Sequence, residues 1–266
     1  SEGCDFKLEE QQYKIFKQML KERRIFWLEF DIRNHFKLGP VKYHNVVASI
    51  KGTKYPDEYV IISGHLDSYD VATGGIDCGT GIGPMMEAAR MIALSGAKPK
   101  RTILFVAFAG EEFGLLGAKA YVKTHAKELG KIANLFNRDG GPTPPVGISV
   151  PQAMYDDFVE VCKPVKEIRA DYPSEVKVAK PFKRPTQSGG TDASVFAVEG
   201  VPTFGFNTQD IKGYNFSYGE IWHTERDLYT KNIPEYQEHA ATVTAVVALG
   251  IANLSKQLSR EGMHKK

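Results

Sequence analysis

Two histidines and six acidic residues occupy positions where an apolar run or a glycine-rich turn ends. They are His65, Asp67, Asp77, Glu111, Glu112, Asp139, His223 and Asp227. If the fold gathers them, so many carboxylates without cations would force some of their pKa values far upward. Two divalent metal ions would supply the missing positive charge. Imidazole and carboxylate ligands suit zinc, or less selectively manganese and cobalt.

The spacing also suggests how these residues divide the work. His65 and Asp67 are two positions apart on a predicted strand, so their side chains point to the same face. The Asp67 carboxylate is then placed to accept the free ring N–H of His65 and to fix the tautomer of the imidazole. In the pair Glu111–Glu112, one carboxylate can bind metal while its neighbour stays off the metal as a base. Each residue taken alone is equally compatible with a helix cap, a surface acid or a packing histidine.

The elements that must position these residues alternate between strands and helices. Apolar runs predict strands at 25–32, 44–52, 59–67, 101–110, 131–141, near 175–179 and at 201–206, and helical spacing predicts helices at 9–23, 81–96, 113–129, 151–163, 191–199 and 234–260. Buried strands alternating with helices indicate an α/β fold with a mixed, mostly parallel central sheet and helices on both faces. Ligands of such sheets bind beyond the carboxyl ends of the strands, where most of the eight residues fall.

Composition limits the class of protein. Hydrophobic residues make up 42% and charged residues 25% of the 266 positions, as in ordinary globular domains. Lysine and arginine exceed aspartate and glutamate by 34 − 32 = 2, which argues against a nucleic-acid binder. No apolar run approaches the length of about 18 residues that a membrane span needs. Three cysteines, Cys4, Cys78 and Cys162, cannot form a disulfide framework.

A set of short motifs identifies a family resemblance. The set comprises H-x-D from His65, D-x-G-x-G from Asp77, E-E-x-G-L-x-G from Glu111, a single Asp139, and W-H-T-x-x-D from 222 to 227. In this combination the sequence resembles the M28 family of co-catalytic zinc peptidases, over about 59–255. The resemblance implies a three-layer fold of the zinc-dependent exopeptidase type, with a peptide as the substrate.

The resemblance also implies a ligand set for two metal ions, most simply zinc. Asp77 would bridge the two ions. His65 and Asp139 would complete one site, and Glu112 and His223 would complete the other.

The same resemblance implies roles for the neighbouring residues. Glu111 would be the general base and Asp67 would orient His65. Family members have a non-proline cis peptide bond after the bridging acid, which here falls between Asp77 and Cys78. Asp227, in the late motif, is a further candidate to support the site.

This chain departs from the family pattern at two informative positions. Cys78 stands where the family often has Asp or Asn, and we interpret it as a small packing residue. Some family aminopeptidases have a tyrosine four residues before the acid that matches Asp192, whereas this chain has Ser188. Either a metal ion stabilises the oxyanion alone, or Tyr214 or Tyr218 enters from the loop before His223. Asp192 itself is a candidate to support the site or to contact substrate.

The predicted function is a metal-dependent exopeptidase, with an aminopeptidase favoured as the commoner family activity. A carboxypeptidase or dipeptidase is the main alternative, and a single-zinc glutaminyl cyclase or a non-catalytic binding protein is less favoured. An exopeptidase must bind a terminal charge. Candidates are Arg138, Lys183, Arg184 and Arg226 for a carboxylate, and Glu220 or Glu225 for an amine. The aromatic-rich segment 206–222 is predicted to line the substrate pocket.

The chain reads as one catalytic domain over 1–266. Several relatives carry an inserted domain, and residues 1–40 resemble the segment that follows such an insertion. The chain is therefore interpreted as a catalytic piece of a longer precursor. Secretion or a periplasmic location is expected from the habits of the family, and the oligomeric state is left open.

Overall fold

A four-stranded mixed sheet forms the centre of the computed structural model, which describes residues 10–29, 31, 33, 35, 39–69 and 71–265. Its strands, in the spatial order β1–β3–β2–β4, are β1 (Val46–Ile50), β3 (Arg101–Phe108), β2 (Tyr55–His65) and β4 (Ile132–Asn137). Strand β2 pairs in parallel with β3 and β4, and β1 is antiparallel to β3. The predicted mixed, mostly parallel sheet is thus confirmed.

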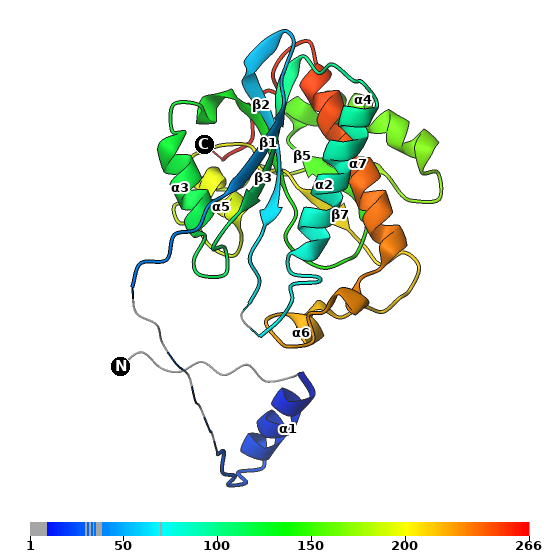
Figure 1. The fold of residues 1–266 in the computed structure, drawn as a ribbon. Coiled ribbons are helices and arrows are strands. Elements are labelled where there is room, and N and C mark those ends of the chain that lie inside the picture. Colours follow the sequence, from blue (N-terminus) through cyan, green and yellow to red (C-terminus); the bar gives the residue numbers. More distant parts are fainter. Residues whose placement is uncertain are drawn as a thin grey trace.

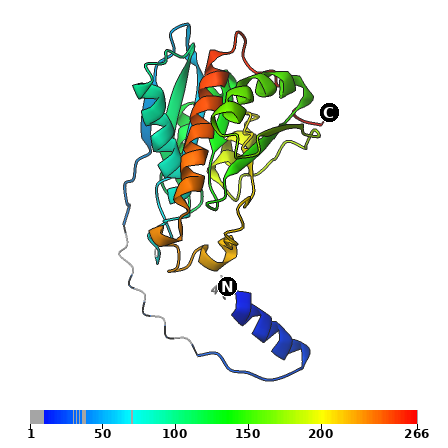
Figure 2. The ribbon, with the colours of Figure 1, turned by 90° about the vertical axis from the view of Figure 1, so that its right-hand side faces the viewer.

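The central strands bury side chains on both faces. Val60 and Ile62 face a core shared with α2 (Gly79–Leu94), α4 (Gln152–Ile168) and α7 (Pro234–Asn253). Ile61, between them, faces a second core shared with α3 (Leu116–Thr124) and α5 (Asp192–Val198). Figure 1 shows these two helical layers on opposite sides of the sheet, and Figure 2 looks onto the layer that contains α2, α4 and α7. Because alternate residues point to opposite faces and both faces are covered, each strand is an almost continuous apolar run.

A smaller three-stranded sheet extends the layer, in the order β6–β5–β7, with β5 (Pro145–Val150), β6 (Glu175–Val178) and β7 (Phe206–Thr208). Strand β5 is not among the strands predicted from the sequence. The strand expected at 201–206 was also misplaced, since β7 begins only at Phe206. Before it, the amide of Asn134 donates to the Phe204 carbonyl and accepts the Phe204 N–H, both at 3.0 Å. The Asn134 side chain therefore takes the place of a backbone partner for Phe204, between the two sheets.

The N-terminal region differs from the prediction in one element. Helix α1 (Glu10–Lys21) confirms the expected helix and lies apart from the α/β layers in Figures 1 and 2. The strand predicted at 25–32 is absent from the described residues of that stretch. Ile25 and Trp27 are 86% and 92% exposed there, so the apolar run has no sheet to join. Residues 1–9, including Cys4, lie outside the described residues.

Helix α7 ends at Asn253, earlier than the predicted residue 260. Lys100 donates from Nζ to the Asn253 carbonyl at 2.8 Å, and Arg101 donates from Nη1 to the Leu254 carbonyl at 2.7 Å. Arg101 is itself buried and bonded to Glu58 at 2.6 Å. These partners satisfy carbonyl groups that a helix end would otherwise leave open.

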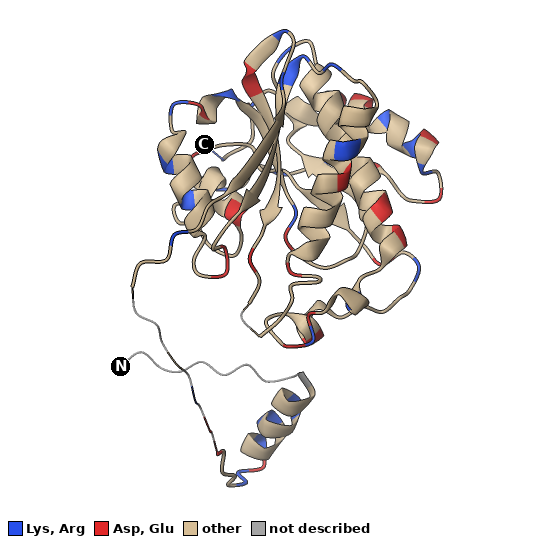
Figure 3. Ribbon diagram, viewed as in Figure 1, with Lys and Arg blue, Asp and Glu red and all other residues tan. Residues whose placement is uncertain are grey.

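The remaining short elements are the 3-10 turns η1 (Leu129–Lys131) and η2 (Tyr229–Lys231) and the single-turn helix α6 (Tyr218–Ile221). No helix in the described part of the chain combines the length and apolar character of a membrane span. In Figure 3, Lys and Arg are interspersed with Asp and Glu over the helices on both sides of the sheet.

Candidate metal centre

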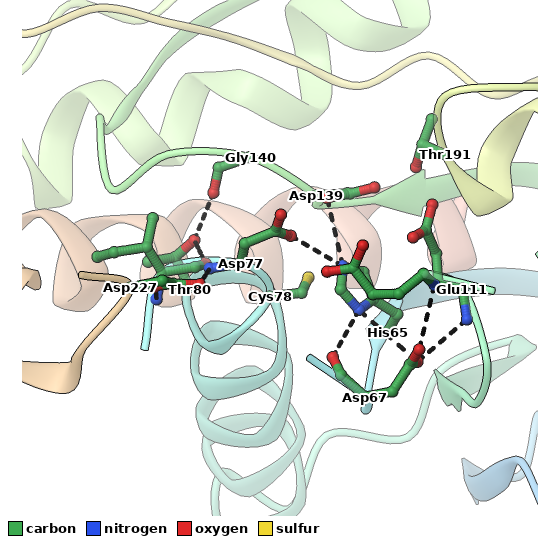
Figure 4. A network of polar contacts seen from close by, with 12 residues as sticks. His65, Asp67, Asp77, Cys78, Thr80, Glu111, Asp139, Gly140, Thr191 and Asp227 are labelled. Carbon is green, nitrogen blue, oxygen red and sulfur yellow. Dashed lines mark hydrogen bonds and ion pairs between the residues drawn. The ribbon is translucent and has the colours of Figure 1, made fainter. Parts of the chain in front are cut away.

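Three neighbouring strands of the central sheet deliver the predicted residues to one edge. Strand β2 ends at His65, which pairs with Phe108 at the end of β3. Beyond β3 the chain turns into Glu111 and Glu112, and beyond β4 it reaches Asp139. Parallel strands share the edge at which they end, so side chains far apart in sequence meet there. Figure 4 shows this meeting point, with Asp77, Asp139 and Glu111 gathered around His65.

His65 lies at the centre of the cluster and is buried. Its Nε2 atom is 2.9 Å from Oδ1 of Asp77 and 3.5 Å from Oδ1 of Asp139. Its Nδ1 atom donates to the backbone carbonyl of Asp67 at 2.8 Å. Since a carbonyl can only accept, Nδ1 carries the proton and Nε2 is directed at the two carboxylates. A cation between Nε2 and those oxygens fits this arrangement.

Asp67 supports the centre in a different way from the one predicted. Its carboxylate is 3.8 Å from the His65 ring, and its backbone carbonyl makes the short contact instead. The carboxylate accepts the N–H groups of Glu111 and Glu112, both at 3.1 Å. Asp67 therefore orients His65 through its main chain and holds the Glu–Glu turn through its side chain. The alternation of side chains along a strand predicts only which side chains share a face, so it could not show that the backbone carbonyl of Asp67 would contact His65.

Glu112 and His223 form a second pair. Nε2 of His223 is 2.8 Å from Oε2 of Glu112, whose Oε1 atom is buried without a hydrogen-bond partner in the described structure. The imidazole is stacked on Tyr69, with ring centroids 4.2 Å apart and an interplanar angle of 6°. Trp222 packs against it at 4.3 Å. Sequence reasoning missed Tyr69, which lies four residues after His65 and carries no motif signal of its own.

Asp77 is fixed by a contact from the far end of the chain. The buried carboxylate of Asp227 accepts the N–H of Ile76 at 2.7 Å and the N–H of Asp77 at 3.1 Å. Burial alone would raise the pKa of Asp77, but hydrogen bonding and charge interaction with His65, followed by a hydrogen bond with Tyr218, hold it below its ordinary value. Asp227 is thus placed as a support for the turn that carries Asp77, as Asp67 is for the Glu–Glu turn.

The electrostatics of the cluster call for added positive charge. Burial, reinforced by the Asp139 charge, raises the pKa of Glu111 to about 8. Burial and the Asp77 charge raise the pKa of Glu112 to about 7. Burial also raises the pKa of Asp192 to about 7, and neither of its oxygens has a hydrogen-bond partner among the described residues. Carboxylates with raised pKa values and unpaired oxygens are expected where cations normally sit.

The donor atoms lie close enough to hold metal. Ligand atoms of His65, Asp77 and Glu112 all lie within 4.8 Å of one another, as do those of His65, Cys78 and Asp139. With the Glu112–His223 contact, the structure brings all five predicted ligands into one centre. Carboxylate and imidazole donors in this number fit zinc.

Cys78 is tightly packed. Its Sγ atom donates to the Arg138 carbonyl at 3.1 Å. It also lies so close to Gly81 and Gly64 that a Cβ there would be 2.5 Å and 3.2 Å from the sulfur. These contacts agree with a small packing residue. The peptide bond between Asp77 and Cys78 is cis, as the resemblance predicts.

The centre opens into a cavity of about 540 Å³. It is lined by Asp77, Glu111, Glu112, Gly114, Leu115, Lys119, Asp139, Gly140, Ser188, Gly189, Gly190, Thr191, Tyr218, Trp222 and His223. From the aromatic-rich segment, Tyr218 and Trp222 reach this cavity, so part of that segment lines it as predicted. Tyr214 does not line it, because its hydroxyl is bonded to Glu235 and its side chain is largely exposed.

The residues proposed to read a terminal charge do not line the cavity. Arg138 donates to the carbonyls of Thr80 and Thr143 at 2.8 Å and 3.0 Å, and Arg184 donates to the Val198 carbonyl. Lys183, Arg226, Glu220 and Glu225 are likewise outside the lining. Among the described lining residues the one lysine or arginine is Lys119 on α3, which was not among the predicted residues. Its position four residues after Leu115 in the E-E-x-G-L-x-G motif was the available signal.

Comparison with known proteins agrees with this geometry. Residues 45–247 match the model of peptidase family M28. Carboxypeptidase Q of Rattus norvegicus is 32% identical over 231 residues, covering 85% of this chain and 46% of that protein. A crystal structure of a peptidase M28 precursor from Shewanella amazonensis has 32% identity and a TM-score of 0.68, over 81% of this chain and 46% of the other.

A zinc aminopeptidase from Bacillus subtilis shares the fold at 22% identity, with a TM-score of 0.60 over 83% of this chain and 53% of the other. The chain spans about half the length of the relatives it matches. The family match covers most of the chain and contains all five candidate ligands. This chain therefore belongs to peptidase family M28.

Proposed function

We propose that this chain is the catalytic part of a zinc-dependent exopeptidase that hydrolyses a terminal peptide bond. Two zinc ions would be held by His65, Asp77, Asp139, Glu112 and His223. When bound, such a pair supplies a Lewis acid for the scissile carbonyl and lowers the pKa of water. The similarity to carboxypeptidase Q, and to a relative named a probable zinc metalloprotease, supports this function.

Glu111 is the residue of this chain that would move the proton. It lines the cavity beside Glu112 but takes no part in the contacts that join the five ligands. Its backbone N–H is anchored by Asp67, which fixes where its side chain starts. In this position it would accept a proton from the attacking water and return it to the leaving amine.

The observation that carries the proposal is the separation of these roles within one cavity. Two histidine–carboxylate pairs, His65 with Asp77 and His223 with Glu112, lie beside a carboxylate that is left out of both. A binding protein without catalysis has no need of that additional acid. A glutaminyl cyclase has the alternative chemistry, but a single zinc ion would leave part of this ligand set unused.

The test is the variant Glu111→Gln. It should keep the zinc content of the unmodified protein and lose about 10²–10⁴-fold in peptide hydrolysis, because only the general base is removed. Glu167→Gln, at an exposed carboxylate of α4 outside the cavity, is the control and should change neither quantity. Near-full hydrolysis by Glu111→Gln would show that another group is the base.

This chain is similar both to a carboxypeptidase and to an aminopeptidase. The 32% identical relative is named a carboxypeptidase, whereas the aminopeptidase is 22% identical and shows the fold alone. The choice between them rests on which terminal charge the cavity can bind.

A further inference from the structure

Lys119 projects from α3 into the wall of the cavity. Its backbone N–H bonds to the Leu115 carbonyl at 3.0 Å, which places the two residues one helical turn apart on one face. Both line the cavity, on the segment that directly follows Glu111 and Glu112. The Lys119 side chain therefore shares a wall with the candidate general base.

The positive charge of Lys119 is an exception in a cavity whose other charged side chains are mainly acidic. Four acids, Asp77, Glu111, Glu112 and Asp139, line it, and Lys119 is the one lysine or arginine among the described lining residues. Its side chain is exposed and makes no ion pair or hydrogen bond with a described residue. By contrast, Lys163, Lys177 and Lys212 each form an ion pair with an acid.

The four acids do not serve as the partner of Lys119, because three of them are candidate ligands and Glu111 is the candidate base. An ammonium group that lines a substrate cavity without an ion-pair partner among the described residues is complementary to an anionic group of the ligand. We propose that Lys119 binds a carboxylate of the peptide substrate and thereby selects substrates with a free carboxylate next to the scissile bond. This inference rests on the proposed function.

The size of the cavity agrees with a short ligand. About 540 Å³ is within the range of about 300–1,000 Å³ typical of small-molecule sites. A dipeptide bound with its carbonyl at the acids would extend its C-terminal carboxylate along the same cavity, which Leu115 and Lys119 of the α3 segment also line. The same ammonium group could alternatively bind the carboxylate of an acidic side chain at that position.

The experiment compares three substrates in zinc-loaded protein: alanyl-leucine, alanyl-leucine amide and alanyl-glutamate amide. All three have the same free amine, and they differ in where a carboxylate is present. Lys119→Ala should raise KM about tenfold to hundredfold for the carboxylate substrate that the site selects, with a smaller change in kcat. Lys119→Arg should retain most of the affinity. Lys123→Ala, one turn further along α3 and outside the cavity lining, is the matched control.

The pattern of losses decides the proposal and the source of the carboxylate. A selective loss with alanyl-leucine identifies the C-terminal carboxylate, and a selective loss with alanyl-glutamate amide identifies the side chain. Equal changes for all three substrates, or no change in Lys119→Ala, would overturn the role of Lys119. Failure of the unmodified protein to hydrolyse any of them with zinc would instead count against the proposed function.

Discussion

Asp227 offers a quantitative test of how the turn that carries Asp77 is held. The Oδ1 atom accepts the Ile76 N–H at 2.7 Å, and Oδ2 accepts the Asp77 N–H at 3.1 Å. Asp227→Asn keeps one acceptor but turns an NH₂ group toward the other N–H. Because a hydrogen bond to a charged group contributes about 1.5–3 kcal/mol, the variant should lose about that much free energy of unfolding.

Two measurements follow from this perturbation. For a chain of this size the loss corresponds to a decrease in Tm of about 3–12 °C in the zinc-free protein. Displacement of Asp77 should also weaken zinc binding about 10–100-fold, the usual effect of removing a group that orients a ligand. Calorimetry gives the first quantity, and competition with a chelator of known affinity gives the second.

The matched control is Asp210→Asn. The Asp210 carboxylate also accepts two backbone N–H groups, those of Gly213 at 3.1 Å and Asn215 at 2.7 Å, but it does not line the cavity. The Asp210→Asn variant should therefore lower Tm without changing the affinity for zinc. If Asp227→Asn also leaves zinc affinity unchanged, the turn does not depend on Asp227 for its geometry and the reasoning is refuted.

Two further predictions concern the charge and the packing of the centre. Burial and Asp139 raise the pKa of Glu111 from its ordinary value of 4.5 to about 8, so the folded state holds this proton more tightly than the unfolded chain. The Tm of the zinc-free protein should therefore fall as pH rises from about 4.5 to about 8, and a Tm that rises over this range would contradict the assignment. Tyr69→Ala, which removes the ring stacked on His223, should weaken zinc binding about 2–10-fold while Tyr69→Phe preserves it. Equal zinc affinities of these two variants would show that the stacking does not position His223.

The sheet and the edge at which the acids meet follow from local patterns. Val60, Ile61 and Ile62 form an apolar run because alternate side chains fill two cores, and such runs are visible in sequence. Residues that come directly after these runs must then lie at the same edge of the sheet. The gathering of His65 and Asp139 could therefore be predicted without coordinates.

Other features depend on contacts between distant segments. The Asn134 side chain replaces strand pairing near Phe204, and Lys100 helps to end α7, although neither residue carries a local signal of this. The stacking of Tyr69 on His223 joins segments 154 positions apart (223 − 69 = 154). Residue type alone does not distinguish Lys119 from the other surface lysines, and only the cavity lining shows its position beside the acids.

The central claim is that the five ligands hold two metal ions in one centre. The most direct test is the number of zinc ions per chain, measured by elemental analysis after reconstitution and removal of free metal. We expect two, which would be held by Asp77 together with His65 and Asp139 on one side and with Glu112 and His223 on the other. A value of one would contradict the two-metal assignment, and a value of zero would contradict the metal centre itself.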